Sequence, residues 1–178
     1  MDAELERILV EDYLDGLAAI GAAELRSRRG ECQVVETQLS YLRRLVQGRH
    51  DIVTSEIDHR RGGGEPGDVT DLVDRLPVIL ADRLHAPGTG RLPAGLEPGE
   101  LRGRLVDRLD AITDALELGA PQDAAADVLA RAADELADLE LEISSLRRSL
   151  FDRIDTIQAE LTRRYRDGET TVDDLLRP

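Results

Sequence analysis

Two long segments of this chain repeat apolar residues at alternating intervals of three and four, and this heptad pattern is the strongest constraint on the fold. It predicts a helix over residues 22–61, whose apolar positions are Cys32, Val35, Leu39, Leu42, Val46, Val53 and Ile57. It predicts a second helix over residues 120–166, whose apolar positions are Leu129, Ala132, Leu136, Leu139, Ile143, Leu146, Leu150, Ile154, Ile157 and Leu161. On a helix this spacing makes one apolar seam, which a second such helix can cover.

The sequence therefore predicts an all-α fold, a long antiparallel helical hairpin (coiled coil) with shorter connecting helices, as a single elongated module over residues 1–178. Pro121 is expected in the first turn of the second long helix, since proline fits the first helical position. Within the connecting region, apolar spacing predicts short helices over 69–84 and 101–116. The lesser segments, in chain order, are a helical leader over 8–17, a Gly/Pro-rich linker over 62–119 and an acidic tail over 167–178.

Composition narrows the class of function. The chain has 37 acidic and 23 basic residues, a formal charge of −14, which disfavours direct binding to nucleic acid and favours a basic protein partner. The single cysteine cannot form an internal disulfide, and no segment approaches the ~20 apolar residues of a membrane span. We therefore expect a cytoplasmic protein that binds neither nucleic acid nor membrane.

A polar motif occurs once on each long helix, offset by the 104 positions that separate Glu36 from Glu140. The first copy comprises Glu36, Ser40, Arg43, Gln47 and Asp51, and the second comprises Glu140, Ser144, Arg147 and Asp155. In the second copy Phe151 stands where the first has Gln47. Steps of four, three, four and four place such residues on an arc of about 80° beside the seam. Each motif is therefore half sheltered by the partner helix.

The residue types of the motif suit a guanine nucleotide. If the antiparallel register centres on Arg43 and Arg147, two like charges meet, which is unfavourable unless an anion binds between them. An arginine fork can donate to guanine O6 and N7 or to a phosphate, and a carboxylate can accept from the guanine N1 and N2 hydrogens. Serine hydroxyls can donate to phosphate oxygens. Two facing copies thus favour a two-fold ligand with two guanines and two phosphates.

The complete first copy, Glu-x3-Ser-x2-Arg-x3-Gln-x3-Asp, resembles the signature of the RsiG family of anti-sigma factors from sporulating actinobacteria. The resemblance covers both long helices and includes the tandem copy of single-chain members. It implies that the nine motif residues bind cyclic-di-GMP, as one molecule or a stacked pair, between the helices. It further implies that the liganded chain, a monomer until then, sequesters a flagellar-type sporulation sigma factor, WhiG, and represses transcription. Phe151 departs from the signature and makes the two half-sites unequal.

Two other classes of function remain open at this level. The first is a ligand-free coiled coil that serves as a structural or adaptor protein. The second is an enzyme acting on cyclic dinucleotides, which is disfavoured because no catalytic loop or metal-ligand cluster is evident. Glu56 and His59 form a single Glu-x-x-His pair where a di-metal bundle needs two, and Cys32 on the seam is expected in the core. Glycines 62–64 lack the following Gly-Lys-Ser/Thr of a phosphate loop.

Overall fold

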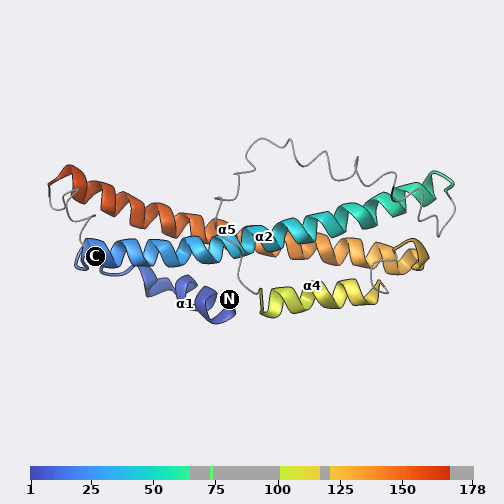
Figure 1. Ribbon diagram of the computed structural model, residues 1–178, viewed down its shortest axis with the longest axis horizontal. Helices are drawn as coiled ribbons and strands as arrows, with labels where there is room; N and C mark the ends of the chain where they lie inside the picture. The colour runs from blue at the N-terminus through green and yellow to red at the C-terminus, as the bar shows by residue number, and fades with distance from the viewer. Residues whose placement is uncertain (65–72, 74–100, 117–120, 169–178) are drawn as a thin grey trace. The chain divides into compact units, whose positions relative to one another are not determined.

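The computed structural model describes residues 1–64, 73, 101–116 and 121–168, and every element within them is helical (Figure 1). The elements are α1 (Asp2–Leu9), η1 (Glu11–Leu14), α2 (Ala22–Arg61), α4 (Arg104–Ala115), η2 (Pro121–Asp123) and α5 (Ala126–Arg166). The long helices α2 and α5 have 40 and 41 residues. The all-α prediction is confirmed. Apart from Val73, the predicted helix over 69–84 lies outside the described residues, as does most of the tail.

The chain divides into two compact units, and each long helix contributes to both. Unit 1 comprises Met1–Leu39 and Ser145–Pro178, and unit 2 comprises Ser40–Ser144. The single module predicted over residues 1–178 concerns how these units are joined, and it stays a prediction.

In unit 1 the segments of α2 and α5 run antiparallel. Arg26 of α2 donates to Tyr165 of α5 at 2.6 Å, whereas Glu36, later on α2, accepts from Arg147, earlier on α5. The seam residues between them are buried, and α1 adds its own apolar side chains to this core. The buried residues of unit 1 include Leu5, Ile8, Leu25, Cys32, Val35, Leu39, Leu150, Ile157 and Leu161.

The leader is not one helix, because α1 ends at Leu9 and Val10 turns to an extended conformation with ψ 150° before η1 begins. Arg153 of α5 occupies a position of the heptad where an apolar residue is usual. It donates from Nε to the Ile8 carbonyl at 2.7 Å and from Nη2 to the Leu9 carbonyl at 2.9 Å. These carbonyls end α1 and have no partner within the helix, so Arg153 satisfies them.

A second arginine holds the segment between η1 and α2. Arg164 is 7% exposed and donates to the Leu17 carbonyl at 2.7 Å and to the Ile20 carbonyl at 2.6 Å. Its charge is balanced by Glu160, which accepts from Arg164 Nε at 2.7 Å. Hydrogen bonds from Arg163 and Arg164 lower the pKa of Glu160 to about 2. The carboxylate is therefore ionised wherever the protein is near neutral pH.

Unit 2 repeats the antiparallel arrangement with the other halves of the long helices. Arg43 of α2 pairs with Glu140 of α5, and Arg60, later on α2, reaches back to Ala124 before α5. Glu142 of α5 joins helix α4 to α5, because it pairs with Arg104 at 2.6 Å and with Arg108 at 2.9 Å. The buried residues of unit 2 include Leu42, Val46, Val53, Leu105, Leu109, Ile112, Leu129, Leu136, Leu139 and Ile143.

Glycines end α2 as their spacing predicts. Gly63 has φ +88°, in the left-handed region that favours glycine. The Gly64 amide donates to the His59 carbonyl at 3.0 Å, and the Gly63 amide donates to the Arg60 carbonyl at 3.1 Å. This pair of bonds is the Schellman arrangement, which satisfies the last carbonyls of a helix.

The predicted start of the second long helix is wrong. Pro121 opens the short η2 turn instead, and α5 begins at Ala126. Arg60 accounts for the difference, because its guanidinium donates hydrogen bonds to the carbonyl oxygens of Ala124 at 2.8 Å and Pro121 at 3.2 Å. Arg60 is itself fixed by Glu56, a buried carboxylate that accepts from Nε at 2.8 Å. Arg60 and Glu56 of α2 thus hold the backbone ahead of α5 in a short 3₁₀ turn, apart from the α-helix.

Two leucines on α5 give a matched test of the seam. Leu139 is fully buried and Leu141 is 70% exposed. We expect Leu139→Ala to lower the free energy of unfolding by about 2–5 kcal/mol, because it leaves a cavity. Leu141→Ala should change it by less than about 0.5 kcal/mol. Chemical denaturation followed by circular dichroism measures both, and equal losses would contradict the assigned seam.

Candidate functional site

The unit 1 cluster consists of Glu36 on α2 with Arg147 and Phe151 on α5. Arg147 donates to one oxygen of Glu36 from Nε at 3.0 Å and from Nη2 at 2.8 Å. The side chains of Arg147 and Glu36 are 19% and 15% exposed. The guanidinium carbon of Arg147 lies 5.5 Å from the centroid of the Phe151 ring. The pair is therefore sheltered by the seam but still reachable from solvent.

The unit 2 cluster consists of Arg43 and Gln47 on α2 with Glu140 on α5. Arg43 Nη1 lies 3.5 Å from Oε1 of Glu140, and the Gln47 amide donates to the same oxygen. Ser40 and Ser144 are half-buried in this unit, at the motif positions before Arg43 and after Glu140. Here one carboxylate gathers two donors from the opposite helix.

The expectation that like charges meet is wrong. In each unit the register sets the glutamate of one helix against the arginine of the other. The seven-residue step from Glu36 to Arg43 is repeated from Glu140 to Arg147, so an antiparallel register can pair both sets at once. That common step is the sequence signal for the pairing. A heptad seam allows sliding by seven residues, so the seam alone does not choose this register.

The two aspartates of the motif are not brought to these pairs. Asp155 is exposed on α5, and Asp51 is half-buried on α2. Each lies eight residues beyond the arginine of its own copy, about 12 Å along the helix axis. They stay candidates for the edge of a larger ligand.

Burial separates the two arginines of each Arg-Arg dipeptide. Arg43 and Arg147 are half-buried beside the seam, while Arg44 and Arg148 are exposed. This difference follows from the helical step of about 100° between neighbours. The first arginine of each dipeptide therefore belongs to the motif.

Each cluster offers a guanidinium fork and a carboxylate, and unit 2 also has the half-buried hydroxyls of Ser40 and Ser144. This donor and acceptor set matches the Hoogsteen edge of guanine, its N1 and N2 hydrogens and a phosphate. The two sets are not identical, because an amide completes the unit 2 cluster and an aromatic ring completes the unit 1 cluster. They can bind the same class of ligand with different contacts.

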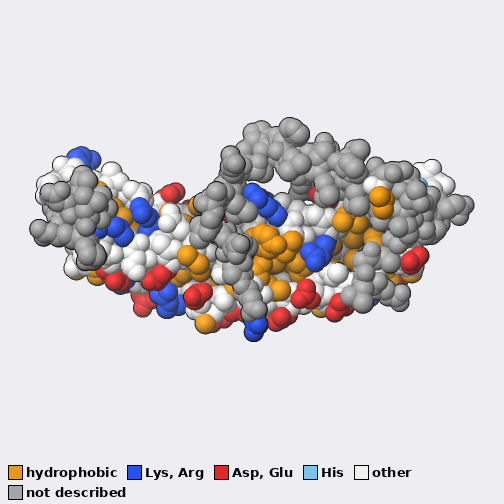
Figure 2. Space-filling view, in the orientation of Figure 1, with side chains coloured by type: hydrophobic (Ala, Val, Ile, Leu, Met, Phe, Trp, Pro, Cys, Tyr) orange, Lys and Arg blue, Asp and Glu red, His pale blue; other side chains and the backbone are white. Residues whose placement is uncertain are grey.

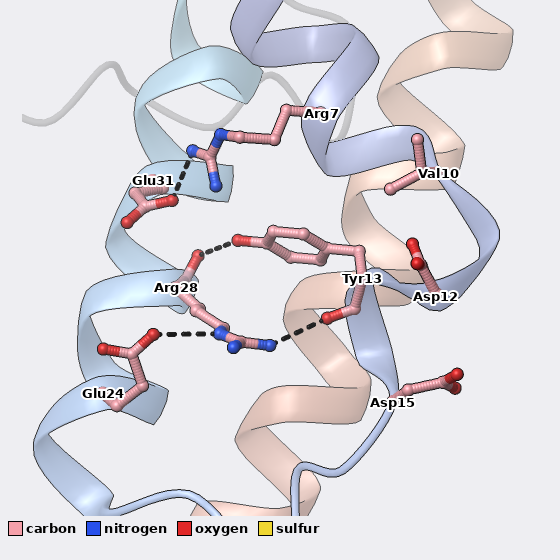
Figure 3. Close-up of a pocket in the computed structure, with 8 residues that line it drawn as sticks. All are labelled: Arg7, Val10, Asp12, Tyr13, Asp15, Glu24, Arg28 and Glu31. Carbon is pink, nitrogen blue, oxygen red and sulfur yellow. Dashed lines mark hydrogen bonds and ion pairs between the residues drawn. The ribbon is translucent and has the colours of Figure 1, made fainter.

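Unit 1 also has an open polar pocket of about 320 Å³ that includes no motif residue (Figure 3). Arg7 pairs with Glu31 at 2.6 Å, and Arg28 pairs with Glu24 at 3.1 Å. Both guanidiniums lie over the Tyr13 ring, at 5.8 Å and 5.6 Å from its centroid. Arg28 also donates from Nη1 to the Tyr13 carbonyl at 3.0 Å, and the Tyr13 hydroxyl donates to the Arg28 carbonyl at 3.3 Å, so these two residues join η1 to α2. The pocket is lined by Arg7, Val10, Asp12, Tyr13, Asp15, Glu24, Arg28 and Glu31.

Cys32 is fully buried, as predicted, and its Sγ lies 3.8 Å from the Tyr13 hydroxyl. Burial raises the pKa of both the thiol and the phenol. The thiol therefore stays protonated near neutral pH and behaves as a small core side chain.

The other sequence candidates take structural roles. Glu56, half of the Glu-x-x-His pair, accepts from Arg60. Among the residues the structure describes, no group of three or more His, Cys, Asp and Glu side chains is placed to hold a metal ion. Nor is any helix in these residues both long and apolar enough to cross a bilayer. Figure 2 shows acidic and basic side chains interspersed on the visible face of the described residues.

Double-mutant cycles would compare the two Glu–Arg pairs. We expect Glu36→Ala and Arg147→Ala to be coupled within the range of about 0.5–3 kcal/mol typical of contacting residues. The coupling of Arg43→Ala with Glu140→Ala should be smaller, since that contact is 3.5 Å long against two bonds of 2.8 and 3.0 Å. Urea denaturation of the single and double variants supplies the values. A stronger Arg43–Glu140 coupling would contradict this ranking.

The comparison with known families agrees with the resemblance of the first copy. The sequence model of the RsiG-like family matches residues 11–80. None of the curated proteins compared with the chain matches it. The matched range contains the whole first copy of the motif, and the second copy lies outside it. Over residues 11–80 the chain is therefore similar to the RsiG-like family.

Proposed function

We propose that this chain is an anti-sigma factor that binds cyclic-di-GMP through the motif residues of its two long helices and, with it, sequesters a sigma factor of the WhiG type in the cytoplasm. The RsiG-like match supports an anti-sigma role and a regulatory, non-enzymatic chain. The observation that supports a ligand is that the glutamate of each copy of the motif pairs with the arginine of the other copy. The acidic charge of −14 suits a partner whose own surface is basic.

Binding exchanges hydrogen bonds and leaves neither the guanidinium nor the carboxylate without a hydrogen-bond partner. The guanidinium of Arg147 leaves Glu36 and donates to guanine O6 and N7 or to a phosphate oxygen. The freed carboxylate then accepts from the guanine N1 and N2 hydrogens, which adenine lacks. Arg43 and Glu140 make the same exchange in unit 2. Partial burial matters here, because a fully buried pair would cost several kcal/mol to separate.

The rival function is a coiled-coil adaptor that takes no ligand. In such a protein the same Glu–Arg pairs would only fix the helix register, as charged residues beside a heptad seam commonly do. The two functions differ in one measurable property, the uptake of nucleotide.

Calorimetric titration of the full chain with cyclic-di-GMP, alone and mixed with a WhiG-type sigma factor, tests the proposal. We expect uptake in at least the mixture, and by linkage the ligand and the sigma factor should tighten each other by the same factor. Cyclic-di-AMP is the control, since it lacks the guanine N1 and N2 hydrogens. If neither sample takes up cyclic-di-GMP, the proposed function is refuted and the adaptor function remains.

Arginine variants test which side chains bind. Arg43→Ala and Arg147→Ala should each abolish ligand uptake in the same titration while leaving the helical circular dichroism nearly unchanged, because neither fills the seam. The matched controls are Arg44→Ala and Arg148→Ala, which remove the same charge from exposed neighbours. If the controls lose binding equally, the motif assignment is wrong.

A further inference from the structure

Phe151 is the only phenylalanine of a chain that has no tryptophan, yet it is 43% exposed. Large aromatic side chains stabilise cores by burial, so an exposed one forgoes much of that gain. Phe151 follows Arg147 by one helical turn and stands on the motif stripe, at the position of Gln47 in the first copy. Its exposure therefore coincides with the candidate site.

The ring and the guanidinium form a layered arrangement in unit 1. Arg147 lies over Phe151 at 5.5 Å, within the range of cation–π attraction, and donates two hydrogen bonds to Glu36 in its own plane. The Arg147 guanidinium is thus held by a carboxylate through hydrogen bonds and also lies over an aromatic ring. With 43% of the residue exposed, the ring also keeps open aromatic surface.

The unit 2 cluster shows what Phe151 replaces. There Gln47 donates its amide hydrogen to Glu140, the same carboxylate that Arg43 contacts. Phe151 has no such hydrogen, and its ring contacts the arginine in place of the carboxylate. The substitution exchanges a hydrogen-bond donor for a flat, polarisable surface.

We propose that the exposed ring of Phe151 is a stacking platform for one purine base of the bound nucleotide, so that of the two unequal clusters the one in unit 1 binds by base stacking. This inference rests on the proposed function. An aromatic face accepts any base and gives little selectivity by itself, so Glu36 and Arg147 read the edge of the stacked base. Unit 2, with Gln47, binds through hydrogen bonds alone.

Phe151→Trp allows base stacking to be followed by tryptophan fluorescence, because the variant chain has a single tryptophan. We expect cyclic-di-GMP, added to the full chain with its sigma factor, to quench the emission at an affinity close to that of the unsubstituted chain. Val34→Trp is the control, since Val34 is 47% exposed in the same unit and lies outside the motif. Quenching in both variants, or in neither, would overturn the proposal.

Phe151→Ala should weaken the binding of cyclic-di-GMP, measured by calorimetry, by about 5- to 150-fold, which is the range for the loss of one base–aromatic stack. Phe151→Gln, which restores the residue type of the first copy, should also weaken it, whereas Phe151→Tyr should not. Unchanged melting midpoints show that each variant is folded. If the unsubstituted chain binds and Phe151→Ala binds equally well, only the stacking platform is refuted. If the unsubstituted chain takes up no cyclic-di-GMP, the proposed function itself fails.

Discussion

The burial of one heptad seam against another, in antiparallel register, is the constraint on which the rest of the structure depends. Side chains one position past the seam are held half in and half out of solvent, and in each unit this geometry sets a glutamate against an arginine. The pairs therefore owe their position to apolar packing more than to their own attraction, which is weak near a surface. A change in the seam would move the charges with it.

That dependence explains how a chain with few aromatic residues and a charge of −14 can present two ordered guanidinium groups. Each arginine is fixed by the opposite helix before any ligand arrives, so little side-chain entropy remains to be lost on binding. The two copies reach this order differently. Gln47 adds a second donor to Glu140, while Phe151 supports Arg147 from its face. The two copies of the motif thus stabilise their arginines by different contacts, a hydrogen-bonded amide in one unit and an aromatic ring in the other.

The sequence predicted the all-α fold and α2, because a regular seam that ends in glycines specifies both the length and the end of a helix. It misplaced the start of α5, since the contacts from Arg60 to the Pro121 and Ala124 carbonyls are tertiary and leave no local pattern. The motif residues could be predicted from the sequence, but the residues that they contact could not. Sliding one helix by seven residues keeps apolar residues facing each other across the seam. The heptad pattern alone therefore does not predict that Glu36 pairs with Arg147.

Two arginines of α5 hold the N-terminal segment by its main chain, so these contacts do not depend on the side chains of the residues that accept them. Arg153 and Arg164 reach it through main-chain carbonyls, at Ile8 and Leu9 and at Leu17 and Ile20. Every amino acid presents the same carbonyl, so these bonds set no requirement on the side chains they join. The requirement falls wholly on the arginines, whose planar fork lysine cannot reproduce. At Ile8, Leu9, Leu17 and Ile20 these bonds therefore leave the choice of side chain to apolar packing, whereas the two arginines on α5 cannot be exchanged for lysine without losing the paired contacts.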